Sequence, residues 1–137
     1  MHLGRRNPHK AYYMTTDGGE LHKLDVADTE KDLGVHIDSK LTFSYHIQQK
    51  VNKANKMLGY IRHTFKHIDT EAFLLLYKSL VRPHLEYAST VWSPHLKYLK
   101  DSIERVQRRA TKLVPSIRHL TYTERLQKLD LETLEYR

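Results

Sequence analysis

The sequence predicts a mainly α fold with a small N-terminal antiparallel β-hairpin, and three observations carry this prediction. The turn residues Asp17, Gly18 and Gly19 separate two short runs near the N-terminus. From Thr42 onward the apolar residues recur with the period of an α-helix. This spacing continues through Pro83, which predicts a helical bundle around a proline-kinked central helix. We expect residues 1–40 to form the hairpin region and residues 41–137 to form the helices.

The first forty residues favour short strands. Glycine supplies the positive φ that tight hairpin turns require, so we expect paired strands over residues 11–16 and 20–26. In "DLGVHID", Leu33, Val35 and Ile37 alternate with polar residues, which is the period of a half-buried strand. This run predicts a third strand in the same small sheet.

The first predicted helix covers residues 42–65. A single apolar stripe follows its length in steps of four and three residues, which is typical of a helix that buries one face. Its members are Ile47, Val51, Ala54, Leu58, Ile61 and Phe65.

The second predicted helix begins at Asp69 or Thr70, either of which can act as its N-cap. Pro83 has no N–H for the carbonyl of Ser79, so we expect a kink there, while the unbroken phase of the stripe argues against a stop. Two neighbouring stripes predict a central helix that is covered on two sides. The first is Leu74, Tyr77, Val81, Leu85, Ala88 and Trp92, and the second is Leu76, Leu80, Tyr87 and Val91.

Two further helices complete the predicted bundle. The third ends at Pro115, and its expected buried residues are Leu99, Ile103, Val106, Ala110 and Leu113. Thr121 and Glu124 stand at the spacing of a capping box, which predicts a short fourth helix. A last helical turn is expected to begin at Asp130.

Composition favours an anionic partner. Lys and Arg number 23 against 16 Asp and Glu, so the net charge is +7, and nucleic acid is the first expectation and an anionic membrane surface the second. The chain has no cysteine, which excludes disulfides and thiolate zinc sites and suits an intracellular protein. No apolar run has the length of a membrane span, and the N-terminus lacks the apolar core of a signal peptide.

Catalytic motifs are nearly absent from the sequence. It contains no adjacent Asp pair, no Gly-rich phosphate loop after a strand and no recognisable nucleophile elbow. His63 and His67 stand four residues apart, but without a third ligand they are interpreted as solvated helix-end histidines and not as a metal site.

The basic residues of the first helix are the candidate binding residues. Between Ser39 and Ile68 there are six Lys and Arg and no acid. Lys50, Lys53 and Lys56 share one arc of the helix, with Arg62 further along, and such an arc can follow a phosphate backbone. A solvated helix face is the alternative interpretation.

Other charged and aromatic residues favour structural roles. Arg105, Arg108, Arg109 and Lys112 are interpreted as a solubility face of the third helix, with Asp101–Arg105 and Glu104–Arg108 as pairs one turn apart. Lys78, Arg82 and Glu86 are expected to form a salt-bridged edge of the central helix. Trp92 and Tyr87 are expected in the core, and stacking platforms for bases are the alternative.

Four phrases of the sequence together resemble a known family. They are "DLGVHIDSKLTFSYHI", "LLLYKSLVRPHLEYASTVWSP", "IERVQRRATKLV" and "YTERLQKLDLETLEYR". In this order they resemble the C-terminal part of reverse transcriptases from non-LTR retrotransposons of the LINE type, jockey and CR1-like. The resemblance covers essentially the whole chain.

The resemblance implies a fragment of an RNA-directed DNA polymerase. It implies that "MHLG" belongs to the late palm, that Leu33, Gly34 and Val35 form the primer grip, and that residues 41–137 form a thumb-like helical bundle and the segment after it. Gly34 would let the main chain approach the primer, or would serve as a bulge or bend in the strand. The expected partners are an RNA or DNA primer and template, and the fingers and palm of the polymerase.

The resemblance also implies that this chain is inactive alone. The polymerase needs Mg²⁺ held by paired aspartates, which the family carries upstream of this region, so we expect no cofactor here. Met1 resembles an internal methionine of a longer reading frame. The alternatives are a stand-alone helical protein-interaction module and a non-functional relic of the element.

Overall fold

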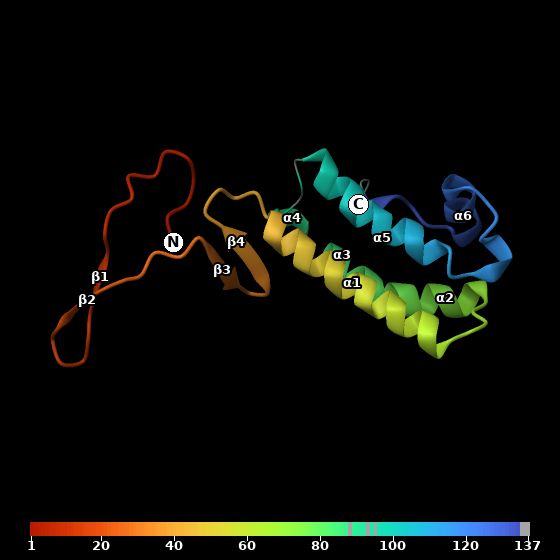
Figure 1. Cartoon of the computed structure of the whole chain (residues 1–137), viewed down its shortest axis with the longest axis horizontal. Coiled ribbons are helices and arrows are strands. Elements are labelled where there is room, and N and C mark those ends of the chain that lie inside the picture. The colour runs from red at the N-terminus through yellow and green to blue at the C-terminus, as the bar shows by residue number, and fades with distance from the viewer. Residues whose placement is uncertain (88, 93, 95, 135–137) are drawn as a thin grey trace. The chain divides into compact units, whose positions relative to one another are not determined.

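The structure is a computed structural model, and it describes residues 1–87, 89–92, 94 and 96–134 (Figure 1). The chain divides between His46 and Ile47 into two compact units. The first holds short strands and the second holds most of the helical residues. The predicted mainly α fold with a small N-terminal hairpin is therefore confirmed.

The first hairpin pairs β1 (Tyr13–Thr15) with β2 (Leu21–Lys23), as the sequence predicts, although both strands are shorter than expected. Gly19 adopts a φ of 80° in the turn, and its N–H donates to the carbonyl of Thr16 at 2.8 Å. A residue with a Cβ would be strained in that conformation, which is why glycine suits the position.

The predicted third strand belongs to a separate hairpin and not to the first sheet. Strand β4 (Val35–Asp38) pairs with β3 (Thr29–Asp32), so the expectation of one three-stranded sheet is wrong. Strand β3 has the sequence "TEKD" and shows no apolar alternation, so no pattern indicated it. Val35 is buried and Ile37 is half-buried, whereas Leu33 lies in the turn and is 84% exposed.

Helix α1 (Ser44–Thr64) forms close to the predicted boundaries. The residues Ile47, Val51, Ala54, Leu58 and Ile61 of its stripe are buried. Phe65 is 45% exposed, so its predicted burial is wrong. The helix ends at Thr64, one residue before Phe65.

The central helical segment consists of α2 (Thr70–Leu76), η1 (Tyr77–Val81) and α3 (Arg82–Glu86). Asp69 is the N-cap, and its carboxylate accepts the N–H of Ala72 at 2.7 Å. The chain stays helical through Pro83, as predicted, but η1 is a π-helical turn in which the N–H of Arg82 donates to the carbonyl of Tyr77. Such a turn is a common way to accommodate a break in the α-helical hydrogen-bond ladder.

The central segment ends earlier than the apolar pattern indicates. Tyr87 has a ψ of 125°, which stops α3, and α4 (Ser89–Trp92) is a separate short helix. In the first stripe Tyr77, Val81, Leu85 and Trp92 are buried and Leu74 is half-buried, while Ala88 lies outside the described residues. The predicted first stripe therefore forms a core over most of its length.

The second predicted stripe of the central segment is not a buried face. Tyr87 is 51% exposed, Val91 57% and Leu80 38%, and Leu76 is only half-buried. The prediction that Tyr87 belongs to the core is therefore wrong, whereas it is right for Trp92, which is 2% exposed. No described helix covers this side, so apolar spacing alone overestimated its burial.

The C-terminal part contains α5 (Lys97–Thr111), η2 (Pro115–Ile117) and α6 (Tyr122–Leu129). Leu99, Ile103, Val106 and Ala110 are buried as predicted, and Leu113 is half-buried beyond the helix end. Both hydrogen bonds of the predicted capping box between Thr121 and Glu124 are present. Asp130 has a φ of 52° and ends α6, and residues 131–133 are not helical, so the last turn does not begin at Asp130 as expected; residues 135–137 lie outside the described part of the chain.

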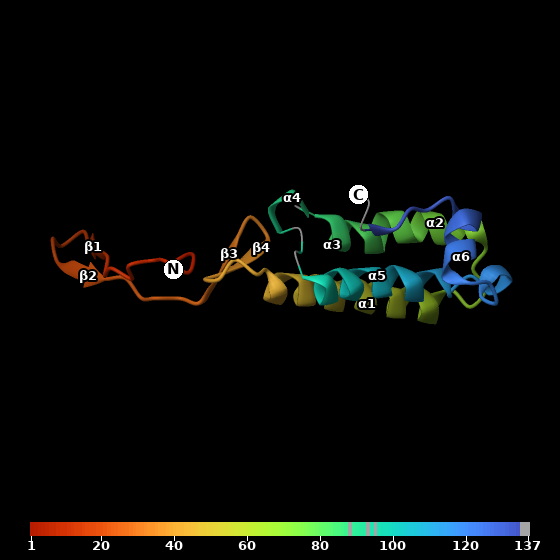
Figure 2. The same ribbon diagram turned by 90° about the horizontal axis from the view of Figure 1, so that it is seen from above.

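The second unit is a bundle of helical rods. Most of α1, the central segment and α5 lie lengthwise beside one another, and α6 lies near one end (Figures 1 and 2). The largest side chains buried between them are those of Tyr77, Phe73 and Ile47. Within the part of the chain that the structure describes, no helix combines the length and apolarity needed to cross a bilayer.

Candidate nucleic-acid interface

Helix α1 displays the predicted basic residues on the surface of the bundle. Its buried stripe holds one side against the core, so Lys53, Lys56 and Arg62 are exposed and Lys50 is half-buried. The helix contains no Asp or Glu. Among the described residues, Lys53, Lys56 and Arg62 form no ion pair. Their charges are therefore available to an anion in solvent.

Lys50 and Lys53 lie on the side of α1 that faces α3. The Nζ of Lys50 stands 5.5 Å from the centre of the Tyr87 ring, which is a cation–π geometry. Burial lowers the pKa of His84, and the charges of Lys50 and Lys53 lower it further. Lys50 and Lys53 of α1 thus lie near enough to His84 of α3 for their charges to act on it, which sequence spacing did not reveal.

Arg62 lies on a different flank of α1 from the lysine arc. It follows Asn55 by two helical turns, which places both residues on the same face. The Oδ1 of Asn55 accepts a hydrogen bond from Nη1 of Arg109 in α5 at 2.9 Å. The structure therefore separates the predicted binding residues into two groups. The lysine arc, which consists of Lys50, Lys53 and Lys56, lies beside α3, and Arg62 lies on the flank beside α5.

The basic residues of α5 are held by aromatic and polar contacts. The guanidinium of Arg108 lies 4.8 Å from the centre of the Tyr122 ring. Glu104 accepts a hydrogen bond from the hydroxyl of Tyr122 and another from the N–H of Leu134 at 2.9 Å. The predicted Glu104–Arg108 and Asp101–Arg105 ion pairs do not form among the described residues.

The predicted polar edge of the central segment forms in part. The Nε of Arg82 donates to Glu86 at 2.7 Å, and this is the ion pair that the structure shows in its described part. Arg82 is only 5% exposed, although the sequence predicted a surface position. Lys78 is exposed and does not join the pair.

Leu33 and Gly34 form the two-residue turn between β3 and β4. Both have positive φ, of 48° and 81°, which is the conformation of a type I′ turn. Such turns favour Asn or Gly, and a leucine there carries a steric cost of about 1 to 2 kcal/mol. Backbone strain of this kind clusters at functional sites. Within the expected primer grip, Leu33 is thus an exposed apolar residue with a strained backbone, and Val35 is buried.

Asp38 organises the passage from β4 into α1. Its carboxylate accepts hydrogen bonds from the N–H groups of Lys40, Thr42 and Phe43 and from the hydroxyl of Thr42. Burial acts to raise the pKa of Asp38, but these hydrogen bonds outweigh it and lower the pKa. Sequence analysis missed this role, although an Asp with a Thr four residues further on, as in "DSKLT", can cap a turn locally in this way.

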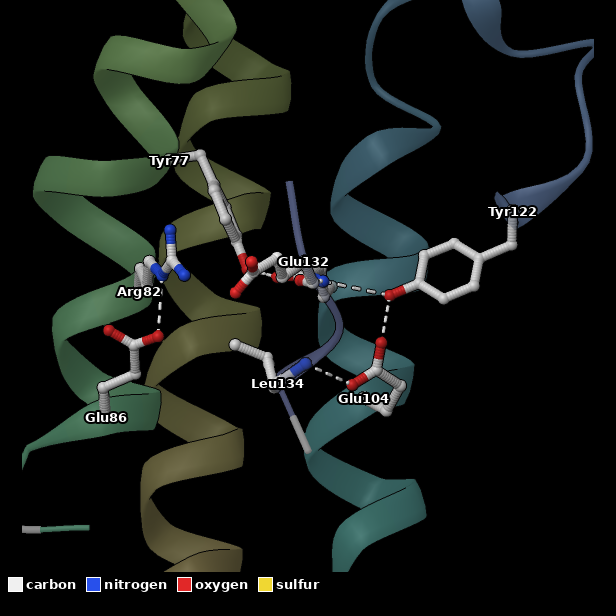
Figure 3. A network of polar contacts seen from close by, with 8 residues as sticks. Tyr77, Arg82, Glu86, Glu104, Tyr122, Glu132 and Leu134 are labelled. Carbon is white, nitrogen blue, oxygen red and sulfur yellow. Dashed lines mark hydrogen bonds and ion pairs between the residues drawn. The ribbon is translucent and has the colours of Figure 1, made fainter. Parts of the chain in front are cut away.

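A second missed feature is a polar network inside the bundle (Figure 3). The hydroxyl of Tyr77 donates to Gln107 at 2.6 Å, and Gln107 donates to the hydroxyl of Tyr122 at 3.1 Å and to the carbonyl of Glu132 at 2.9 Å. Burial raises the pKa of both tyrosines, and the neighbouring Glu104 adds to this for Tyr122. The network joins η1, α5 and α6 and holds the segment after α6 against them.

A cavity of about 900 Å³ opens beside this network. Trp92, Ile103 and Leu134 contribute apolar walls, and Glu86, Glu104 and Arg108 contribute charged ones. Both oxygens of Glu104 accept hydrogen bonds from Tyr122 and Leu134, and Glu86 accepts one from Arg82. Glu86 and Glu104 are therefore engaged in hydrogen bonds within the bundle.

The histidines do not assemble a metal site in the described residues, where no group of three or more His, Asp or Glu could hold an ion. His63 and His67 are both exposed, at the end of α1 and in the loop after it.

Comparisons with known proteins add one distant relative. No family model and no solved structure matches the chain. It is 28% identical over 82 residues to a protein of Caenorhabditis elegans whose name, "Uncharacterized protein B0403.1", assigns no function. The match covers 60% of this chain and 41% of that protein, so the chain spans less than half of the relative.

Proposed function

We propose that the chain is a piece of a LINE-type reverse transcriptase that contacts the backbone of the primer and template. The observation that carries this proposal is α1, a helix of 21 residues without an acid, whose apolar side is buried and whose Lys53 and Lys56 are exposed. Lysines in this arrangement contact phosphates without reading sequence, because a phosphate backbone is the same for every base.

The hairpin tip gives the proposal independent support. Leu33 is 84% exposed and Gly34 has a φ of 81°, so the β3–β4 turn presents an apolar side chain beside a main chain that no Cβ screens. A main chain of this kind can approach a nucleic-acid backbone closely. Leu33, Gly34 and Val35 would then act as the primer grip that the resemblance implies.

Salt-dependent binding tests the proposal. The purified chain is titrated against a fluorescently labelled RNA–DNA hybrid at about 50 and about 200 mM salt, and the slope of log affinity against log salt is measured. The combined change Lys50→Ala, Lys53→Ala and Lys56→Ala should weaken binding at least about tenfold and reduce the slope by roughly 3.

A matched variant removes the same charge elsewhere. Lys78, Lys97 and Lys128 are exposed and stand on three other elements, so their combined change to Ala should weaken binding much less. An equal loss in both variants would mean that total charge and not the lysine arc drives binding. Circular dichroism checks that both variants retain their helices.

The polymerase reaction provides a second test. We expect the purified chain to extend no primer with Mg²⁺ and deoxynucleotides, because the sequence holds no adjacent Asp pair for two-metal catalysis. Measurable primer extension by material free of contaminating polymerase would contradict this expectation.

A protein-interaction module is a second candidate, and the exposed apolar residues of the central segment favour it. Leu75 is 72% exposed, Val91 57% and Tyr87 51%. Exposed apolar residues mark interaction sites in many soluble proteins when they form one contiguous patch. Sedimentation of the wild-type chain and of a Leu75→Ser, Val91→Ser variant distinguishes the candidates, because self-association that the variant abolishes would favour the module.

A further inference from the structure

One side of α5 carries four basic residues. They stand at positions i, i+3, i+4 and i+7, a spacing that places them on one face of a helix. All four are exposed, and the buried apolar stripe of α5 occupies the other side. These residues will be called the basic face of α5, and they are Arg105, Arg108, Arg109 and Lys112, the last of which is the C-cap.

Among the described residues, no acid forms an ion pair with the basic face of α5. The sequence holds no Asp or Glu from residue 105 to residue 123. Glu104 directly precedes the face, and its two carboxylate oxygens accept hydrogen bonds from the hydroxyl of Tyr122 and the N–H of Leu134 (Figure 3). The expected pairs with Asp101 and Glu104, which belonged to the interpretation as a solubility face, are therefore absent from the described structure.

Uncharged groups hold two arginines of the basic face in place. The guanidinium of Arg108 lies 4.8 Å from the centre of the Tyr122 ring, and Nη1 of Arg109 donates to Oδ1 of Asn55 at 2.9 Å. Such contacts restrict the side chains but leave their charges in place. Less conformational entropy is then lost when an anion binds, so the face is partly organised in advance.

Two further arginines add positive charge near the C-terminal end of α5. The Nε of Arg118 donates to the carbonyl of Lys112 at 3.0 Å, which brings its guanidinium to the end of the basic face. Arg125 is 4% exposed, and it donates to Oγ1 of Thr111 at 2.9 Å and to the carbonyl of Leu120 at 2.6 Å. Neither acceptor carries a formal charge, so this buried cation adds to the positive potential of the region.

The basic face of α5 continues onto α1. Asn55, which accepts the hydrogen bond from Arg109, stands two helical turns before the exposed Arg62 and on the same side of α1. The Asn55–Arg109 bond therefore joins the Arg62 flank of α1 to the basic face of α5. The lysine arc lies on the other flank of α1, so the bundle presents positive charge on both sides of this helix.

We propose that the basic face of α5, together with Arg118, is a second contact surface for a nucleic-acid backbone. The inference rests on the proposed backbone contact and deepens it, because it adds a surface outside α1. Guanidinium groups bind phosphate oxygens through two parallel hydrogen bonds, and three of the four residues of the face are arginines. The face extends about 10 Å along α5, over which one strand of a duplex presents about three phosphates.

Salt-dependent binding of the labelled RNA–DNA hybrid tests the inference in the whole chain. The combined change Arg105→Gln, Arg109→Gln and Lys112→Gln removes three charges from the face and leaves Arg108 on the Tyr122 ring. The affinity should fall at least about tenfold, and the slope of log affinity against log salt should fall by roughly 3. Unchanged affinity and slope would overturn the inference.

Two further variants serve as controls. Lys10, Lys78 and Lys128 are exposed and lie outside the face, so their combined change to Gln should weaken binding much less. The double change Arg105→Lys, Arg109→Lys keeps both charges and should keep the wild-type slope. An equal loss in the Lys10, Lys78 and Lys128 variant, or a slope that falls in the Arg→Lys variant as far as in the Gln variant, would overturn the inference.

A chemical footprint tests the same surface without any substitution. Phenylglyoxal modifies exposed arginines, and mass spectrometry measures the extent at each position. Saturating hybrid should protect Arg105 and Arg109 of wild type at least about threefold, as expected for groups held against phosphates. Inorganic phosphate at the same phosphate concentration is the control and should protect neither. Equal modification with and without hybrid would overturn the inference.

The outcomes separate this inference from the proposed function. If the lysine-arc variant loses binding and the α5 variant does not, the proposed backbone contact stands and the second surface is overturned. If wild type binds no hybrid at either salt concentration, both are overturned. If wild type binds polyglutamate as tightly as the hybrid at equal charge, and the α5 variant loses both, the face recognises acidic protein and nucleic acid is overturned as its partner.

Discussion

Different interactions stabilise the two units of the chain. In the hairpin unit every residue of β1, β2 and β3 is exposed, and Val35 is the apolar side chain of this unit that is buried. The bundle buries a continuous core that includes Phe73, Tyr77 and Val81. Turns and local hydrogen bonds therefore determine the hairpins, whereas hydrophobic burial determines the bundle.

This difference has a functional meaning. Isolated two-stranded hairpins are marginally stable in water, so the strained Leu33 tip belongs to a region with little packing to hold it. The basic helix α1, by contrast, belongs mostly to a unit that can hold its lysines at a constant spacing. Of the two predicted contact regions, the lysine arc is therefore the one better prepared before a partner binds.

Removing a core side chain from the bundle should have the largest effect. Phe73 is 1% exposed and stacks on Tyr77, with ring centres 5.5 Å apart. Phe73→Ala should destabilise the bundle by about 3 to 5 kcal/mol, because it deletes buried surface and leaves a cavity. Urea unfolding followed by circular dichroism measures the loss. Leu75→Ala, at a residue that is 72% exposed, is the control and should cost less than about 0.5 kcal/mol.

The turn of the second hairpin should respond in the opposite direction. Leu33→Gly removes the steric cost of positive φ, so β3–β4 should become more stable by about 1 kcal/mol. Amide hydrogen exchange at Lys31 and His36 reports the change. Leu33→Ala keeps a Cβ and should show no such gain. If both variants protect the hairpin equally, backbone strain at Leu33 is not the cause.

The cap of α6 tests local hydrogen bonding inside the bundle. The hydroxyl of Thr121 accepts the N–H of Glu124 at 3.3 Å. Thr121→Ala should cost about 1 kcal/mol of stability, because the first turn of α6 loses its acceptor. Thr123→Ala, two residues further along, changes an exposed side chain outside the cap and serves as the control. Equal losses in the two variants would remove the special role of the capping box.

The smallest expected effect depends on pH. The backbone and hydroxyl of Thr121 lower the pKa of Glu124 below its usual 4.5. Because the folded-state pKa is the lower one, this contribution is present above 4.5 and is lost as the pH falls through the folded value. The melting temperature of wild type should therefore exceed that of Glu124→Gln at neutral pH and approach it in acid. A constant difference would contradict this mechanism.

Local chemistry in the sequence predicted much of the fold. Asp69 caps α2 and Thr121 caps α6, because capping depends on a side chain and the N–H groups of the next turn. The turn at Gly19 and the helical path through Pro83 were predicted for the same reason. These features depend on residues close together in the chain.

Features that depend on the packing of distant segments were harder to predict from the sequence. The second apolar stripe looked buried, but Tyr87 and Val91 are exposed, because periodicity does not say whether a neighbour exists on that side. The apolar pattern of α5 did not single out Gln107, and only the approach of Tyr77 and Tyr122 makes it the centre of a buried network.

The candidate site shows the same difference between features set by neighbouring residues and features set by tertiary packing. The sequence by itself determined that α1 carries an acid-free set of lysines beside an apolar stripe, since charge and helical period are properties of neighbouring residues. Only the tertiary structure decided that the charges of Lys50 and Lys53 act on His84, while Arg62 lies on the flank that faces α5. The physical reason is that side-chain charges interact through space, so the packing of α1 against α3 and α5 determines which of them act together.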